Sequence, residues 1–157
     1  MTDRSTETVS QVRDLREDDL ADVIRIDALQ TGERKPDYWE SVFAEFLVRG
    51  GNRLRVGLAV QVDARMAGYL LGEVRAFEFG SEACGWIFAV GVDPDQLRTG
   101  VGSQLLQEGC RRFAGAGVDR VRTMVRRNNV PVLSFFRANR FVAGSFVQLE
   151  LDLEDGT

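Results

Sequence analysis

The sequence predicts a mixed α/β fold in which a mostly antiparallel central sheet carries helices on both faces. Three observations lead to this prediction. The chain has 157 residues, of which 44% are hydrophobic, which is enough for one domain with its own core. Segments with the period of a helix alternate along the chain with apolar segments of strand length. Two strand-like segments are separated by a two-residue turn, which is typical of an antiparallel hairpin. We expect a flexible N-terminus over residues 1–10 and a single domain over residues 11–154.

The first third of the chain predicts one strand and two helices. We expect a short strand at residues 12–15, followed by a helix capped by Asp18 and Asp19. The apolar side chains expected on its buried face are Leu20, Val23, Ile24 and Leu29. A second helix is expected at residues 36–48, because the missing N–H of Pro36 would be unpaired at a helix start, and it should stop at Gly50 and Gly51. Its expected buried residues are Trp39, Val42, Phe43, Phe46 and Leu47.

The remainder of the chain predicts strands interrupted by two helices. Residues 53–63 and 65–79 form the hairpin, with its turn at Asp63 and Ala64, and the apolar segment 85–92 forms the next strand. A helix follows at residues 101–117, with a buried stripe of Val101, Leu105, Leu106, Cys110 and Phe113. We then expect a short strand in 118–126, a helix at 131–139 with Pro131 in its first turn, and an alternating strand at 141–153. The predicted order is therefore β-α-α-β-β-β-α-β-α-β.

Composition excludes several classes of function. The net charge of −4 argues against a nucleic-acid-binding face, which would be basic. Histidine is absent, which excludes Ser-His-Asp and Cys-His catalysis and most transition-metal sites, and Cys84 and Cys110 lack metal-ligand spacing, so we expect no metal. The N-terminal segment has no apolar core of a signal peptide, and no apolar segment is long enough to span a bilayer. We therefore expect a cytoplasmic protein with no membrane partner.

The segment DPDQLRTGVGSQLL contains two closely spaced glycines, Gly100 and Gly102, where a strand gives way to a helix. Without side chains at these positions, the unpaired N–H groups of the helix start can approach a ligand, and the helix dipole favours an anion such as a phosphate. A plain tight turn would also explain two glycines. The spacing matches neither the dinucleotide-binding pattern GxGxxG nor a P-loop.

Two segments together resemble the GNAT superfamily of N-acetyltransferases: VGVDPDQLRTGVGSQLL and, further along, NNVPVLSFFRANRF. The family's loop has glutamine or arginine, any two residues, glycine, any residue, then glycine or alanine. Its later motif has an asparagine before a short helix with an aromatic pair, usually followed by glycine-phenylalanine. The predicted order of elements also matches the family's fold, so the resemblance covers nearly the whole chain.

The resemblance implies acetyl-CoA as co-substrate and assigns residues to it. The loop backbone would bind the CoA pyrophosphate; its residues are Leu97, Arg98, Thr99, Gly100, Val101 and Gly102. In the family, the preceding strand is bulged and diverges from the next strand; Gly91 is our expected bulge, since glycine relieves crowding. Main-chain groups of Phe88, Val90 and Val92 would pair with pantetheine amides, and an N–H near Val90 would polarise the thioester carbonyl. Asn129 is expected near the pantetheine, or as an N-cap for the following helix, or in both roles.

Three residues depart from the family pattern. Leu97 replaces the usual glutamine or arginine, so Arg98 and Thr99 are the expected polar contacts. Phe136 replaces the tyrosine that protonates the departing thiolate in many members, so water takes that role or no acid is needed. Arg140 replaces a glycine before Phe141, which we expect to affect a turn only.

The general base and the acceptor site are predicted from position. Trp86 stands where some relatives carry a glutamate, which leaves Glu73, Glu78 and Glu82 as candidate bases. Glu73 is preferred because it lies in the middle of a strand, where a purely structural acid is less expected. For the acceptor, Arg34 and Tyr38 are four residues apart and would share a helical face, which suits an amine that also bears an anion, such as a peptide or amino acid.

The predicted function is direct transfer of an acetyl group from acetyl-CoA to a primary amine within a ternary complex, without a covalent enzyme intermediate. The acceptor would be a small amine, a peptide or a protein amino group; no nucleic-acid partner is expected, and homodimer formation is left open. The alternative is a GNAT-fold protein that binds CoA or acyl-CoA as a sensor without catalysis, which Phe136 and Trp86 would suit. A phosphate-ligand module unrelated to CoA is disfavoured by the second motif.

Overall fold

The computed structural model describes residues 10–48, 54–76 and 79–154. The chain divides into two compact units, Met1–Met124 and Val125–Thr157. Of the expected flexible N-terminus, residues 1–9 lie outside the described residues, as does the expected helix stop at Gly50 and Gly51, whereas Ser10 begins the first strand.

Among the described residues of the first unit, five strands form one sheet in the order of the chain. They are β1 (Ser10–Asp14), β2 (Arg55–Val62), β3 (Arg65–Arg75), β4 (Cys84–Val92) and β5 (Val121–Thr123). Pairing is antiparallel from β1 to β4, and β5 is parallel to β4. The β2–β3 turn falls at Asp63 and Ala64 as predicted, and both have positive φ (51° and 64°), as a type I′ hairpin turn requires.

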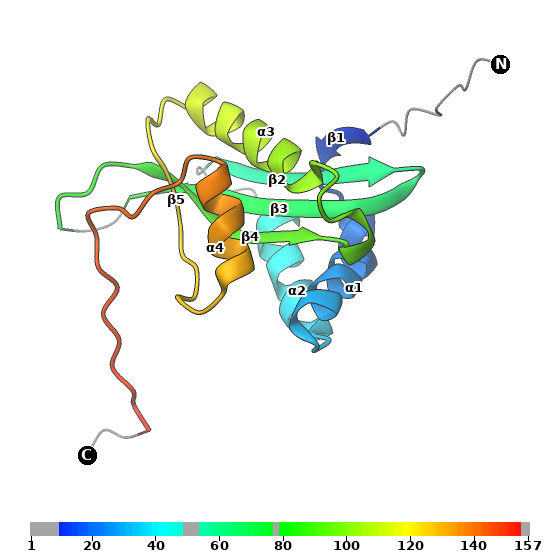
Figure 1. Ribbon diagram of the computed structural model, residues 1–157, viewed down its shortest axis with the longest axis horizontal. Coiled ribbons are helices and arrows are strands. Elements are labelled where there is room, and N and C mark those ends of the chain that lie inside the picture. Colours follow the sequence, from blue (N-terminus) through cyan, green and yellow to red (C-terminus); the bar gives the residue numbers. More distant parts are fainter. Residues whose placement is uncertain (1–9, 49–53, 77–78, 155–157) are drawn as a thin grey trace. The chain divides into compact units, whose positions relative to one another are not determined.

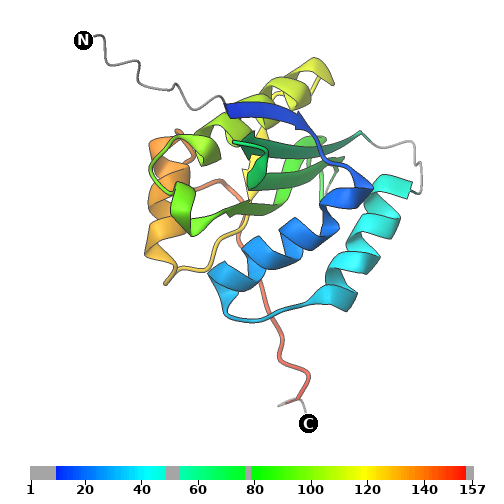
Figure 2. The ribbon, with the colours of Figure 1, turned by 90° about the vertical axis from the view of Figure 1, so that its right-hand side faces the viewer.

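Helices cover both faces of this sheet, which confirms the predicted fold class. Figures 1 and 2 show α1 (Leu20–Thr31) and α2 (Pro36–Phe43) on one side and α3 (Val101–Gly115) on the other. The α1/α2 side buries one core cluster: Leu15, Val23, Ile24, Ile26, Trp39, Phe43, Ala59, Met66, Tyr69 and Leu71. On the α3 side, Val101, Leu105, Leu106 and Phe113 are buried as predicted, whereas Cys110 is only partly buried. Short helical turns precede α1 (η1, Glu17–Asp19) and α3 (η3, Pro94–Gln96), and one π-helical turn follows α2 (η2, Ala44–Val48).

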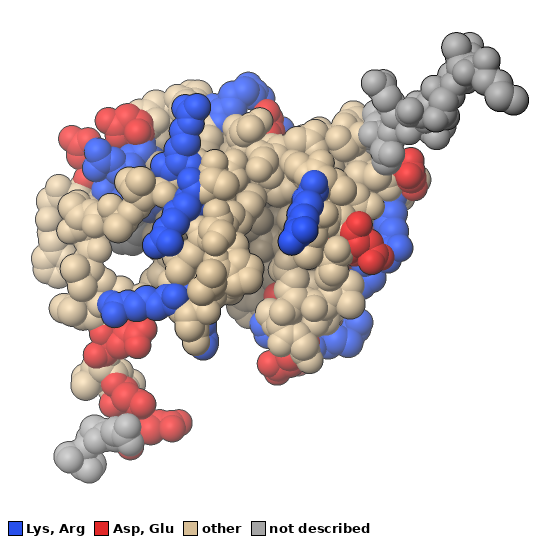
Figure 3. All heavy atoms as spheres, viewed as in Figure 1, with Lys and Arg blue, Asp and Glu red and all other residues tan. Residues whose placement is uncertain are grey.

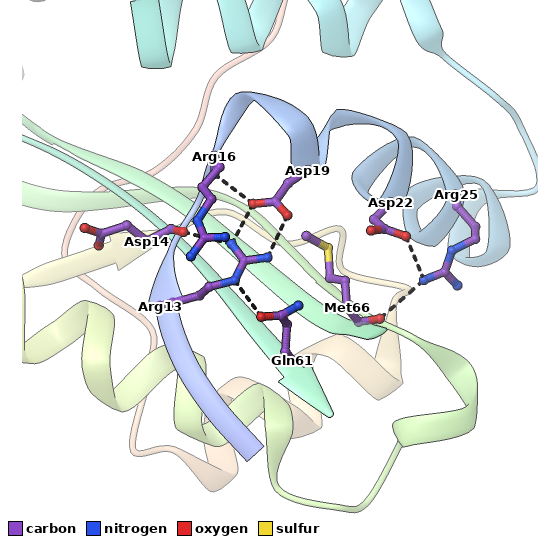
Figure 4. Close-up of polar contacts among 8 residues, drawn as sticks. All are labelled: Arg13, Asp14, Arg16, Asp19, Asp22, Arg25, Gln61 and Met66. Carbon is purple, nitrogen blue, oxygen red and sulfur yellow. Dashed lines mark hydrogen bonds and ion pairs between the residues drawn. The ribbon is translucent and has the colours of Figure 1, made fainter. Parts of the chain in front are cut away.

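The start of α1 differs from the prediction in two respects. Asp19 does not cap the helix through its side chain; its carboxylate accepts two hydrogen bonds from Arg13, at 2.7 and 2.8 Å, and one from the N–H of Arg16 at 2.7 Å. Figure 4 shows this arrangement, which ties β1 to the turn before α1. Burial by itself raises the pKa of Asp19, but these hydrogen bonds outweigh it and leave the pKa below its usual value. Leu29 is 56% exposed, because the buried stripe of α1 continues through Ile26 and Asp27 instead.

The helix α1 ends at Gly32, whose positive φ of 79° closes it, and α2 begins at Pro36 as predicted. Of the predicted buried residues of α2 and its extension, Trp39 and Phe43 are buried, while Val42, Phe46 and Leu47 are partly buried.

The second unit contains α4 (Val130–Ala138) but not the predicted strand at residues 141–153. This prediction was wrong, because alternation supplies the side-chain pattern of a strand but no hydrogen-bonding partner for its backbone. Its apolar side chains are exposed, for example Val147 at 79% and Leu149 at 89%. Figure 3 shows red acidic side chains on the segment before the C-terminus.

Candidate active site

The strand β4 carries a bulge at Phe88. Leu71 pairs with Ala89 and Gly72 pairs with Ile87, so Phe88 is an extra residue opposite β3. The prediction of a bulge at Gly91 was wrong: Gly91 pairs normally with Tyr69, and a Cβ there would lie 2.4 Å from the Tyr69 ring. Glycine is needed at 91 for a close approach of the ring.

Beyond the bulge, β4 is open on the side of β5. The parallel pairing covers only Gly85–Ile87 with Val121–Thr123, and the Thr123 hydroxyl donates to the Ile87 carbonyl at 2.9 Å where the pairing stops. Residues 88–92 therefore have no β5 partner within the described chain. One of their carbonyls, that of Val92, accepts a hydrogen bond from the Gln30 amide of α1 at 3.0 Å. Phe88, Val90 and Val92, the predicted pantetheine-binding residues, all lie on this open edge.

The loop before α3 has the features of an anion-binding site. Arg98 and Gly100 both have positive φ (66° and 87°), and α3 starts at Val101 as predicted. No acidic residue lies in the first turn of α3 and no side chain caps it, so its first N–H groups are available. A Cβ at Gly100 would meet no atom within 4 Å, so this position faces open space.

The first three loop residues, Leu97, Arg98 and Thr99, are exposed and form the rim of this loop. Leu97 is 58% exposed, and the guanidinium of Arg98 has no hydrogen-bond or ion-pair partner among the described residues. The Thr99 hydroxyl donates to the Gln96 carbonyl at 2.5 Å. Val101 and Gly102 are buried at the start of α3, so they contribute through their backbone.

Asp93 joins this loop to α1. Arg25 donates to its carboxylate at 2.8 Å, Arg65 lies at 3.7 Å, and the N–H of Asp95 donates at 3.0 Å. Burial by itself raises the pKa of Asp93, but the hydrogen bonds and charges of these partners lower it below its usual value. The network holds the end of β4 against α1.

The predicted base candidates occupy different surroundings. Glu73 lies on β3 opposite Trp86, with a side chain 18% exposed and an ion pair to Arg75 at 3.1 Å. Glu82 is exposed. Glu78 lies outside the described residues.

Arg34 and Tyr38 do not share a helical face, because α2 begins at Pro36 and Arg34 precedes it. Both side chains are exposed, Tyr38 at 54%. The Tyr38 ring packs edge-on against Trp39, with centroids 5.2 Å apart.

In the second unit, Asn129 is the N-cap of α4 as predicted, since its side chain accepts the N–H of Val132 at 3.3 Å. The Phe136 ring packs edge-on against Phe135 and Phe141, each with centroids 5.1 Å apart. Arg140 has a φ of 70°, so this residue adopts the left-handed conformation that favours glycine.

Three polar residues that lie near β4 were not identified from the sequence: Asp27, Gln30 and Tyr69. Asp27 could have been found because it continues the helical stripe of Val23 and Ile24, where an acid is unexpected. No sequence signal separates Tyr69 from a core aromatic residue or Gln30 from a surface residue. Within the described ranges, no group of three or more Cys, Asp or Glu side chains is placed to hold a metal ion, and no helix is long and apolar enough to cross a membrane.

In this fold a bulged and open β4 leads to a glycine loop at the start of a helix. Comparison with known proteins identifies the class of protein that has this arrangement. Residues 20–141 match the acetyltransferase (GNAT) family, and the chain belongs to it. Mycothiol acetyltransferase of Clavibacter michiganensis subsp. michiganensis is 36% identical over 84 residues, 54% of this chain but 26% of that protein. The chain thus spans about a quarter of the length of this curated relative.

Solved structures show the same fold at low sequence identity. An aminoglycoside N-acetyltransferase, AAC(6')-Iy in complex with CoA, superposes with a TM-score of 0.81 at 14% identity, covering 98% of this chain and 99% of the other. A protein described as a transcriptional regulator from Bacillus halodurans C-125 gives a TM-score of 0.76 at 17% identity, covering 92% and 100%.

Proposed function

We propose that this protein transfers the acetyl group of acetyl-CoA directly to a primary amine within a ternary complex. The observation that carries the proposal is the continuity of two features: the open backbone edge at residues 88–92 leads into a loop whose helix-start N–H groups are available. An extended chain of amides ending in a pyrophosphate, as in CoA, fits such an edge followed by such an anion site.

In this proposal the backbone of residues 97–102 binds the pyrophosphate, and Arg98 adds a positive charge from the exposed rim. The main chain of Phe88, Val90 and Val92 pairs with the pantetheine amides, which requires Gln30 to release the Val92 carbonyl. The Val90 N–H polarises the thioester carbonyl, and developing negative charge on that oxygen is stabilised there. Asn129 is a further proposed contact beside its role as a cap.

The acceptor amine attacks the thioester carbon, the C–S bond breaks, and the nitrogen loses a proton. Glu73 is the proposed base, acting directly or through water, after release from Arg75. The thiolate leaves without an enzyme acid, because Phe136 has no proton to give and a thiol of pKa about 8.5 is a good leaving group. Arg34 and Tyr38 remain the proposed contacts for an anionic group of the acceptor, now from a loop and a helix rather than from one helical face.

The proposal is tested by thermal unfolding with acetyl-CoA, with ATP as a control nucleotide, followed by mass spectrometry of a panel of amines. Stabilisation by acetyl-CoA together with an acetylated amine is expected. Stabilisation by ATP but not by acetyl-CoA would reject the assignment.

A second candidate function is a sensor of CoA or acyl-CoA. It is favoured by Phe136, which packs against two other phenylalanine rings at the position where many family members have a tyrosine as proton donor. It predicts stabilisation by acetyl-CoA with no acetylated product from any amine in the panel.

A further inference from the structure

The carboxylate of Asp27 lies inside the α1/α2 layer with two nitrogen donors on one oxygen. Asp27 is 9% exposed. Its Oδ2 accepts a hydrogen bond from the Trp39 indole N–H at 3.0 Å, and the Lys35 ammonium lies 3.5 Å from the same oxygen. The other oxygen, Oδ1, has no hydrogen-bond or ion-pair partner among the described residues. The carboxylate thus has unused capacity to accept hydrogen bonds.

Tyr69 supplies a second, independent observation. It is only 2% exposed, yet its hydroxyl has no hydrogen-bond partner in the described part of the chain. The Tyr69 ring packs edge-on against Trp39, with centroids 5.6 Å apart, and the Trp39 indole donates to Asp27, so Tyr69 and Asp27 both contact the same side chain. In keeping with this, burial raises the pKa of Tyr69 and the negative charge of Asp27 raises it further. Among the described residues this hydroxyl is not one of the fully buried polar atoms that lack a partner, so the small exposed area of Tyr69 includes the hydroxyl. A ligand can therefore reach the hydroxyl, whose capacity to donate and accept a hydrogen bond is not used by the described residues.

Both groups lie close to the open edge of β4. Tyr69 pairs with Gly91, and its ring and hydroxyl occupy the space that a Cβ at Gly91 would need, 2.4 to 2.7 Å away. Gln30, one helical turn beyond Asp27, donates to the Val92 carbonyl. The Asp27 face of α1 therefore meets β4 next to Val90, the proposed contact of the thioester carbonyl.

Lys35 shows what kind of group this site accepts. It is the only lysine of the chain, its side chain is 35% exposed, and it lies in the loop before α2 rather than in a helix. A primary ammonium carries three N–H donors, enough for a carboxylate and a hydroxyl at once. The position of Lys35 therefore shows that a primary ammonium fits against Oδ2 of Asp27.

We propose that the Asp27 carboxylate and the Tyr69 hydroxyl form the binding site for the protonated primary amine of the acceptor, and that Lys35 occupies this site until the acceptor displaces it. The inference rests on the proposed function and adds the residues that bind the acceptor, as a primary alkyl ammonium. It assigns binding and orientation to Asp27 and Tyr69, and leaves proton removal to a separate group.

The Trp39 indole N–H reports on this site, because it donates to Asp27. The experiment records the indole ¹H–¹⁵N signals of the CoA-saturated protein during titration with n-butylamine, and with n-butanol as the uncharged probe of the same length. The chain has two tryptophans, so a Trp86→Phe variant assigns the signals. We expect a saturable shift of the Trp39 signal with n-butylamine and none with n-butanol.

Four variants decide the interpretation. Tyr69→Phe and Asp27→Asn should each weaken n-butylamine binding about tenfold or more, as loss of a hydrogen bond to a charged group implies. Lys35→Met should strengthen binding, because it removes the competing ammonium. Asp37→Asn, an exposed acid on α2, is the matched control and should leave binding unchanged.

No saturable shift in the wild-type protein, or unchanged binding in Tyr69→Phe, would overturn the inference. Should Asp27→Asn fail to fold, Tyr69→Phe and Lys35→Met still decide, since neither removes the Trp39 acceptor. The proposed function fails separately: a shift without acetylated product retains the ammonium site and rejects the activity, whereas acetylation that is insensitive to these variants retains the activity and rejects the site.

Discussion

Replacing Gly100 by glutamate should abolish acetyl-CoA binding while the fold survives. The φ of 87° imposes a left-handed strain of about 1–2 kcal/mol on any side chain, but nothing lies within 4 Å of the added Cβ, so no clash adds to it. The new carboxylate would project into the space at the start of α3 where the pyrophosphate is proposed to bind. Its negative charge and bulk then exclude the ligand.

The assay is the change in melting temperature on adding acetyl-CoA. At about one hundred times the dissociation constant, a ligand stabilises the wild-type protein by about 2.7 kcal/mol. For a chain of this size that corresponds to roughly 5–11 °C. We expect no such shift in Gly100→Glu.

Gly117→Glu is the matched control, because Gly117 has the same φ of 87° and the same open surroundings beyond the other end of α3. Both variants should lose similar stability without ligand, and only Gly117→Glu should keep the acetyl-CoA shift. Equal shifts in the two variants would mean that the loop is a turn and not an anion site.

Three further predictions follow from the same structure. Glu73→Gln should lower acetyl transfer by about two to four orders of magnitude with little change in acetyl-CoA affinity, whereas Glu82→Gln should not; wild-type turnover in the first would remove Glu73 as the base. The pKa of Asp93 is lower in the folded protein than in the unfolded chain, so its ionised carboxylate stabilises the fold above the unfolded pKa of about 3.9. That stabilisation is lost as the pH falls through the folded pKa. Chemical denaturation at pH 7 and pH 3 should therefore show a smaller loss of unfolding free energy in Asp93→Asn than in the wild type. Arg140→Gly should stabilise the protein by up to about 1 kcal/mol by relieving a φ of 70°, and calorimetry should find no gain in Arg140→Ala, which keeps the strain.

Features that depend on a few neighbouring residues were predictable from the sequence. The turn at Asp63 and Ala64, the α2 start at Pro36 and the Asn129 cap all follow from local backbone preferences. The buried stripe of α3 follows from helical spacing, apart from the half-buried Cys110. These local signals, placed in order along the chain, were sufficient to predict the fold class and the family.

Predictions that relied on pairing between distant segments were less secure. The glycine at position 91 predicted a bulge there, but the bulge is at Phe88. The register is set by the packing of β3 against β4. Glycine is required at position 91 because the Tyr69 ring approaches it closely. Alternation predicted a strand at residues 141–153, but pairing requires a partner backbone that the pattern itself does not supply.

The sequence by itself determined most of the elements, the glycine loop and the family, because each depends on short-range spacing along one chain. Only the tertiary structure decided which polar groups meet: Asp27 and Tyr69 are forty-two residues apart, and neither belongs to a motif. Helix α1 must pack across β3 and β4 before the Asp27 carboxylate, the Tyr69 hydroxyl and the open strand edge lie in one place. Residues that meet through packing leave no periodic signal in the sequence, which is why this candidate acceptor site became visible only in the folded chain.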